Sequence, residues 1–165
     1  MSTESPIKTA RVQGRRVLHF DSIDDALADV QQLAISERQG KVKCLGNWTA
    51  GQTLGHLATW AEYAYDEMPK RVPFFVRWLM KPLKNRVLNE PMRAGAKLPR
   101  TPGGTLGTDA VPFEEGLDRF CKSFTRLKGE RPTQPNALFG ELTQEEWIKL
   151  QLRHAELHLS FLRCD

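Results

Sequence analysis

The sequence predicts an all-α protein, a four-helix bundle whose helices run up-down-down-up. Three observations support this fold class. Four segments place apolar residues at helical spacing, two of them open on a capping-box pattern, and no segment reads as a convincing strand. The link between the second and third helices is about 45 residues long, enough for a crossover between parallel helices. The 165 residues suffice for one core, so a single domain over residues 1–165 is expected.

The first helix is predicted to open at Asp21–Asp25 and to close at Gly40. Residues 1–14 form a polar lead, and Arg16–Phe20 is apolar enough to dock as an extended segment. Acidic residues in the first turn suit the positive end of the helix dipole. The apolar positions of this helix are Ile23, Ala26, Leu27, Val30, Leu33 and Ala34.

The second helix is predicted from Thr49 to about Glu67, ahead of Pro69. Thr49 and Gln52 have capping-box spacing. The buried stripe comprises Leu54, Leu57, Ala61 and Ala64. His56 lies beside that stripe, on a line with Gln52, Trp60, Tyr63 and Glu67. This line is half polar and half aromatic, which suits the lining of a cavity better than a dry core.

The long connection is basic and rich in proline. Between Lys70 and Arg100 there are nine Lys or Arg residues and one acid, Glu90, a net charge of +8. Pro73–Met80 is predicted to form a short helix that breaks near Pro82, and residues 98–108 are predicted to form a loop. Three interpretations stay open: a solvated crossover, a rim that attracts anions, or a segment that touches nucleic acid or, as an interfacial helix, a membrane. The interfacial interpretation rests on Phe74, Phe75, Trp78 and Leu79 beside Arg77 and Lys81.

The third helix is predicted from Pro112 and Phe113 to about Lys128, with Gly129 ending it. Its apolar face comprises Leu117, Phe120, Cys121, Phe124 and Leu127. The fourth helix is predicted to begin at the second capping box, Thr143–Glu146.

The fourth helix carries two histidines, His154 and His158, one turn apart and therefore on one face. The residues that share this face are Trp147, Leu150, Gln151, Leu157 and Phe161. The opposite arc carries Lys149, Arg153, Glu156, Ser160 and Arg163. Both imidazoles are therefore predicted to point into the core and not into water.

His56, His154 and His158 together suggest a site for a divalent metal such as zinc, nickel or iron. Three neutral imidazoles leave coordination positions open, which is typical of a catalytic site. The alternative is that each is a core histidine bonded to a neighbour. The spacing excludes a zinc protease, because the acid, Glu156, points away from both rings. No P-loop, dinucleotide-binding glycine motif or nucleophile elbow is present.

The composition indicates which cellular compartment and which partners to expect. Cys44, Cys121 and Cys164 are odd in number and far apart, which favours reduced thiols and a cytoplasmic protein. The start of the chain has neither a basic segment nor an apolar core, so no signal peptide is expected. No apolar run reaches about 18 residues, so no membrane span is expected. Nucleic acid is not an expected partner.

Two stretches resemble a known superfamily: Leu45–Leu57 (LGNWTAGQTLGHL) and Phe139–Phe161 (FGELTQEEWIKLQLRHAELHLSF). They are similar to the DinB/YfiT-like metalloenzymes, and more closely to a branch known only as a domain of unknown function. The resemblance implies an up-down-down-up bundle with a metal held by His56, His154 and His158. The superfamily includes enzymes that use a small thiol such as bacillithiol, mycothiol or glutathione. It therefore implies a thiol-dependent S-transferase with a low-molecular-weight thiol as cosubstrate.

The expected function is thus that of a metal-dependent enzyme acting on a small molecule, in which an anionic thiol is one candidate substrate. Gln52, Tyr63 and Glu67 are the candidates for orienting water or substrate. Two alternatives stay open: a metal-dependent hydrolase, and a non-catalytic metal-containing bundle that binds a ligand or partner. A homodimer is one candidate assembly.

Overall fold

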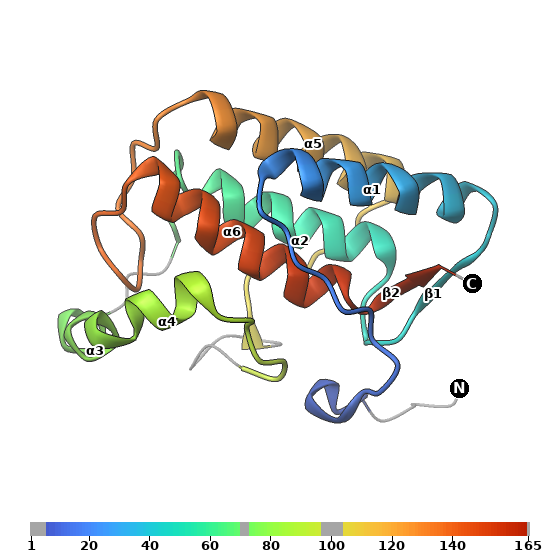
Figure 1. Ribbon diagram of the computed structural model, residues 1–165, viewed down its shortest axis with the longest axis horizontal. Helices are drawn as coiled ribbons and strands as arrows, with labels where there is room; N and C mark the ends of the chain where they lie inside the picture. Colours follow the sequence, from blue (N-terminus) through green and yellow to red (C-terminus); the bar gives the residue numbers. More distant parts are fainter. Residues whose placement is uncertain (1–5, 70–72, 97–103, 165) are drawn as a thin grey trace.

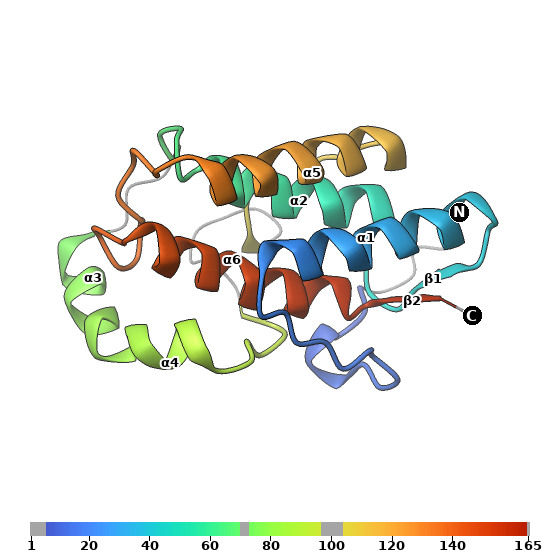
Figure 2. The ribbon, with the colours of Figure 1, turned by 45° about the horizontal axis from the view of Figure 1, so that its top comes forward.

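The computed structural model describes residues 6–69, 73–96 and 104–164, and the chain is mostly helical. Four long helices lie side by side (Figures 1 and 2). They are α1 (Ile23–Arg38), α2 (Ala50–Glu62), α5 (Phe113–Gly129) and α6 (Gln144–Leu159). Their inward faces share one core, in which Leu54, Phe120 and Phe124 have no exposed surface. No helix within the described ranges is long and apolar enough to cross a membrane.

Side-chain caps fix where three of the long helices begin. Thr49 and Thr143 each accept a hydrogen bond from the third residue of their helix, and Gln52 and Glu146 return the contact to the cap. Ser22 forms the same reciprocal arrangement ahead of α1. Such a cap stabilises a helix by about 1 kcal/mol because it satisfies amides that the helix itself leaves unpaired. The predicted starts of α2 and α6 are confirmed.

The end of α2 differs from the prediction, because the helix stops at Glu62 and not near Glu67. Tertiary hydrogen bonds turn the chain there. The Ala64 carbonyl accepts from the amides of residues 133 and 134. The Tyr65 hydroxyl donates towards two carbonyls at the end of α5, 3.2 and 2.9 Å away. These partners lie far along the chain, so the local sequence does not reveal them.

Glycine lets α2 and α5 approach closely. A Cβ atom on Gly116 would lie 2.6 Å from the Gly51 carbonyl oxygen, and one on Gly51 would lie 2.2 Å from the Val111 oxygen. Both glycines are near the first residues of their helices, while Tyr65 joins the opposite ends. The two helices therefore run in the same direction, and the long connection between them is a crossover.

The absence of a sheet was predicted wrongly. β1 (Val42–Cys44) and β2 (Leu162–Cys164) form a small antiparallel sheet in which Val42 lies opposite Cys164. Each strand has three residues, too few for an alternating pattern to show in the sequence. The pairing ties the chain that follows α6 to the link between α1 and α2.

The long connection contains more helix than predicted. The short helix α3 spans Phe74–Met80, and a 3₁₀ turn over Lys81–Leu83 follows it where the break near Pro82 was expected. A further short helix, α4 (Lys84–Asn89), then packs near α6, where Lys84 pairs with Glu146 at 2.6 Å. Of the predicted loop over residues 98–108, the part up to residue 103 lies outside the described residues.

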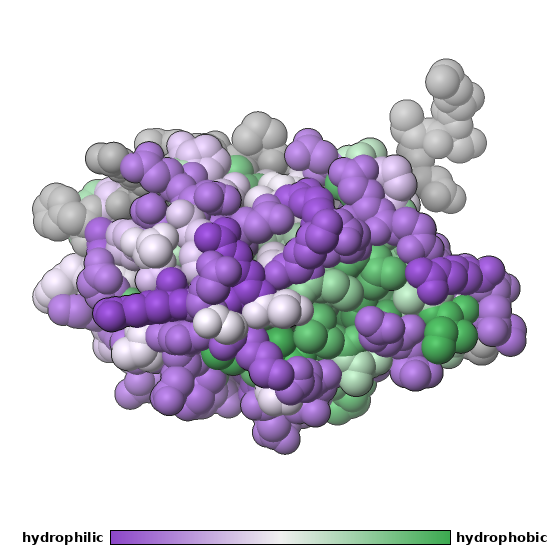
Figure 3. Space-filling view, turned by 90° about the horizontal axis from the view of Figure 1, so that it is seen from above, coloured by the Kyte–Doolittle hydropathy of each residue, from purple (hydrophilic) through white to green (hydrophobic). Residues whose placement is uncertain are grey.

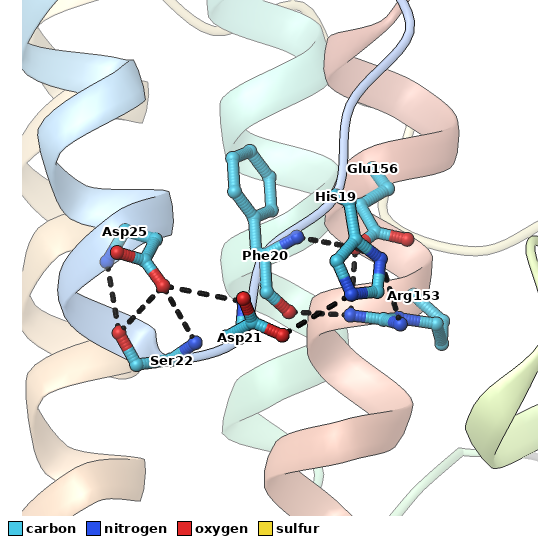
Figure 4. Close-up of polar contacts among 7 residues, drawn as sticks. All are labelled: His19, Phe20, Asp21, Ser22, Asp25, Arg153 and Glu156. Carbon is cyan, nitrogen blue, oxygen red and sulfur yellow. Dashed lines mark hydrogen bonds and ion pairs between the residues drawn. The ribbon is translucent and has the colours of Figure 1, made fainter.

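The N-terminal segment covers the polar arc of α6, preceded by a short 3₁₀ helix, η1 (Thr9–Arg11). The Phe20 amide donates to Glu156 Oε1 at 2.6 Å, and the Arg153 guanidinium donates to the Phe20 carbonyl (Figure 4). Arg153 and Glu156 also pair with each other at 2.7 Å and are 7% and 6% exposed. The segment docks as expected, and it buries two charged side chains that the helical wheel placed away from the histidines.

Candidate metal centre

α2 and α6 bring the three predicted histidines together. His56 lies 98 positions from His154, yet their Nε2 atoms are 3.2 Å apart. One ring nitrogen from each of His56, His154 and His158 lies within 4.8 Å of the other two. The ring centroids are 4.6 to 5.0 Å apart and the rings meet edge to face. The three histidines singled out by the sequence therefore form one cluster in the structure.

The spacing fits a divalent ion. Bonds of about 2.0–2.1 Å in a tetrahedral site place two ligand nitrogens about 3.3 Å apart. The His56–His154 pair already has this separation at 3.2 Å. No cysteine or carboxylate joins the cluster in the part of the chain that the structure describes.

A backbone carbonyl sets the tautomer of His56. Its Nδ1 lies 2.8 Å from the Leu106 oxygen. Because a carbonyl only accepts, the proton sits on Nδ1 and the Nε2 lone pair faces His154. Metal-binding histidines are oriented in this way, with the remote N–H donated to a carbonyl or carboxylate. The three histidines therefore fit a metal by two criteria: the distance between ring nitrogens and the tautomer of His56.

All three imidazoles are held neutral. Burial lowers the pKa of His56 to about 4, against weaker opposing effects of hydrogen bonds to the backbone of Leu106 and Gly107. Burial also lowers the pKa of His154 well below its usual value, and the neighbouring His158 and His56 add to this. The pKa of His158 falls for the same first reason, then through His56 and Arg15. Neutral imidazole is the form that binds metal.

Two tryptophans wall the cluster. Trp48 stacks on His158 with ring centroids 5.1 Å apart, and Trp60 meets His154 edge to face at 5.5 Å. His56 is 1% exposed, whereas His154 and His158 are half-buried. The prediction that both α6 rings point into the core is therefore only partly met. They face His56 and keep some exposed surface.

The loop that carries Leu106 and Gly107 completes the site. This role was not predicted from the sequence. The Leu106 carbonyl accepts from His56, and the Trp60 indole donates towards it at 3.4 Å. Gly107 has a φ of +69°, and a Cβ there would lie 2.9 Å from Thr59 on α2. The glycine therefore permits a close approach that any other residue would hinder. Its presence in a glycine-rich loop was the only signal.

The three predicted catalytic candidates are spread around the cluster. Gln52 accepts from the Thr49 amide and donates to the Thr108 carbonyl at 3.3 Å, so it holds the loop. Tyr63 packs edge to face on Trp60 at 5.9 Å and lines a cavity of about 10 Å³ beyond it. Glu67 lies after the end of α2 and is exposed. Among the described residues, none of the three forms a hydrogen bond with a histidine ring.

Arg15 places a positive charge at the end of α6. Its guanidinium donates to Ser160 Oγ at 2.8 Å and to the Leu157 carbonyl at 3.4 Å, and it lies 4.2 Å above the Phe161 ring. Among the described residues no carboxylate pairs with it. Its charge is near enough to His158 to contribute to the lowered pKa of that ring.

Comparison with known proteins gives one match. Residues 12–165 match the family described as "Protein of unknown function (DUF1569)". No curated protein matches the chain, and no solved structure matches it. The family match includes all three histidines and covers most of the chain. On that extent, the chain belongs to the DUF1569 family.

Proposed function

We propose that the protein is a metal-dependent enzyme in which His56, His154 and His158 hold one divalent ion. One observation carries the proposal: the Leu106 carbonyl fixes the proton of His56 on Nδ1, so that Nε2 presents a lone pair 3.2 Å from His154 Nε2. A structural zinc site is normally closed by a fourth protein ligand, and this cluster has three. Three ligands and half-buried α6 rings favour an open, catalytic site.

The proposed reaction is the transfer of a small thiol to an electrophile. A divalent ion in this site would lower the pKa of a thiol or water that coordinates it. Trp48 and Trp60 restrict the access of bulk water to the rings. Gln52 acts as a positioning residue, since it holds the loop whose carbonyl orients His56. Tyr63 and Glu67 remain proposed contacts of water or substrate.

Two of the three cysteine thiols, those of Cys44 and Cys121, do not suit the role of nucleophile. Burial raises the pKa of Cys44, with Glu37 adding to the effect. Burial likewise raises the pKa of Cys121, with Asp118 adding to it. Both thiols are therefore held protonated at neutral pH. The proposal accordingly takes its sulfur from a diffusible, low-molecular-weight thiol.

The charge of Arg15 favours an anionic thiol. Its guanidinium is half-buried and lacks a carboxylate partner within the described ranges, while His158 lies close enough to respond to its charge. An unneutralised cation beside an open site raises the local concentration of anions. A carboxylate-bearing thiol thus fits the site better than a neutral one.

We also propose the finer fold and setting that this function implies. The four long helices form an up-down-down-up bundle of the DinB/YfiT-like kind, in one domain. The three separated cysteines favour the reducing cytoplasm.

Metal analysis tests the site first. Protein purified without a histidine tag should carry about one divalent ion per chain, and His154→Ala should lose it. His19→Ala is the matched control, because His19 lies outside the cluster. Equal metal content in the two variants would exclude the three-histidine site.

Ligand discrimination tests the reaction class. With cobalt in the site, 3-mercaptopropionate should give a sulfur-to-cobalt absorption band at a lower concentration than 2-mercaptoethanol. Arg15→Gln should remove that preference and leave metal affinity unchanged, whereas Arg11→Gln should keep both. Metal binding without any thiol band would reject the transferase and leave the hydrolase or the binding bundle.

A further inference from the structure

The most exposed apolar side chains of the long connection gather on α3 and the turn after it. Trp78 is 75% exposed, Leu79 65% and Leu83 43%, and Phe75 is 60% exposed. Elsewhere in the described chain, the large apolar residues with comparable exposure are Ile7, Val17 and Ile35. Ile35 lies on α1, over which apolar surface also gathers in Figure 3.

The exposed residues share one side of α3. Phe75 lies three and four positions before Trp78 and Leu79, which is the spacing of one helix face, and Leu83 lies in the 3₁₀ turn that follows α3. The other side, with Val76 and Met80, is half-buried, and the following α4 buries Leu88. The short helix therefore has its apolar stripe turned outward. α3 and α4 lie to one side of the four long helices (Figures 1 and 2).

The surroundings of this stripe are positively charged. The described part of the connection carries five Lys or Arg residues and one acid: Arg77, Lys81, Lys84, Arg86 and Arg93 against Glu90. That acid, Glu90, already pairs with Arg86 at 2.8 Å, and Lys84 pairs with Glu146 of α6. Lys81 and Arg93 have no carboxylate partner among the described residues. A second copy docked symmetrically through this face would bring like charges together, so charge complementarity favours an anionic occupant.

We propose that the outward face of α3 and the turn after it (Phe75, Trp78, Leu79 and Leu83) is a docking surface for an anionic phospholipid bilayer. Tryptophan and phenylalanine lie stably at the boundary between headgroups and acyl chains. Nearby Lys and Arg add attraction to acidic headgroups, each worth about a fivefold gain in binding. The apolar stripe and its cations together match that boundary, in which the helix lies flat and does not span.

Vesicle flotation of the full chain tests this surface. Wild-type protein should bind phosphatidylcholine vesicles containing about 30% phosphatidylglycerol at least tenfold more strongly than phosphatidylcholine alone. Binding should weaken as salt is raised. Lipids brominated near the glycerol backbone should quench wild-type tryptophan fluorescence, and Trp78→Phe should remove most of that quenching.

Two matched variants distinguish binding through this face from non-specific binding through other exposed apolar residues. Trp78→Ser/Leu79→Ser should lose at least about tenfold in binding to anionic vesicles. Val17→Ser/Ile35→Ser removes two exposed apolar residues from other surfaces and should bind within about twofold of wild type. Circular dichroism checks that both variants keep their helices.

Three results would overturn the proposal. No binding to anionic vesicles excludes lipid and leaves an acidic protein as the occupant. An equal loss in both double variants removes the assignment to α3. The wild type could form a concentration-dependent dimer that only Trp78→Ser/Leu79→Ser abolishes. In that case the occupant of this face is a second copy of the chain. None of these results depends on metal binding, so they leave the proposed function untouched.

Discussion

A single carbonyl oxygen decides the chemistry of His56. The two nitrogens of neutral imidazole differ in role, and the contact of Nδ1 with the Leu106 oxygen assigns them. The sequence shows the three histidines through their spacing on helices. It does not show Leu106, because a main-chain oxygen has no residue-type signature. The sequence also does not show that Arg153 and Glu156 are buried. Their partners are backbone groups of Phe20, more than 130 positions away.

The lowered pKa values predict how metal binding depends on pH. The pKa of His56 lies at about 4, below the value near 6.5 of free histidine. Protons compete with metal only below the pKa of the folded site. Affinity, measured against a chelator of known strength, should therefore stay level from about pH 8 to 6 and fall as pH approaches about 4. A decline that begins near pH 7 would mean that the rings titrate as exposed histidines.

The buried pair of Arg153 and Glu156 should be costly to break. Glu156→Gln keeps an oxygen for the Phe20 amide but leaves the guanidinium without a counter-charge. Urea unfolding should show that Glu156→Gln lowers the free energy of unfolding by about 3–5 kcal/mol. Adding Arg153→Met should recover part of this loss.

The exposed pair of Arg86 and Glu90 is the control for that measurement. Its side chains are 61% and 57% exposed, and Glu90→Gln should cost at most about 0.5 kcal/mol. Equal losses at the two sites would mean that the buried pair contributes no more than a surface pair.

At the scale of elements, the starts of the helices were predictable and some of their ends were not. A capping box is formed by two residues three positions apart, so it can be recognised in the sequence. Thr49 and Thr143 therefore predict the starts of α2 and α6. The end of α2 depends on hydrogen bonds from the loop before α6, and β1 and β2 are too short to show a period. The close approach of α2 and α5 is likewise visible only in space, because glycines in a helix have several uses.

Gly116→Ala should force α2 and α5 apart. The new methyl group would lie 2.6 Å from the Gly51 oxygen, a backbone atom that cannot turn aside. We expect a loss of at least about 2 kcal/mol in the free energy of unfolding. Gly129→Ala, in the same helix with open space around it, should change it by less than about 1 kcal/mol. Similar values for the two variants would show that the contact is not tight.

At the scale of the whole molecule, the core is large enough to fold without metal. The four long helices bury an apolar interior that continues from Phe20 to Leu162. Zinc fingers, in contrast, depend on their ion to fold because they lack such a core. The metal should therefore add stability without being required for the fold.

Thermal melts of wild type, chelated wild type and His154→Ala test that difference. All three should melt cooperatively from a helical state. Metal at about a hundredfold excess over its dissociation constant should stabilise only the wild type, by about 2.7 kcal/mol. If chelation alone removes the helices, the metal is structural and the binding bundle becomes the better description.

The 98 positions between His56 and His154 also govern when the site can exist. During synthesis α2 leaves the ribosome long before α6, and at about 5–20 residues per second the delay lasts several seconds. Throughout that interval the nascent chain offers one imidazole of the three and binds no metal tightly. Loading of the proposed ion would therefore follow the synthesis of α6, because only then are all three imidazoles present.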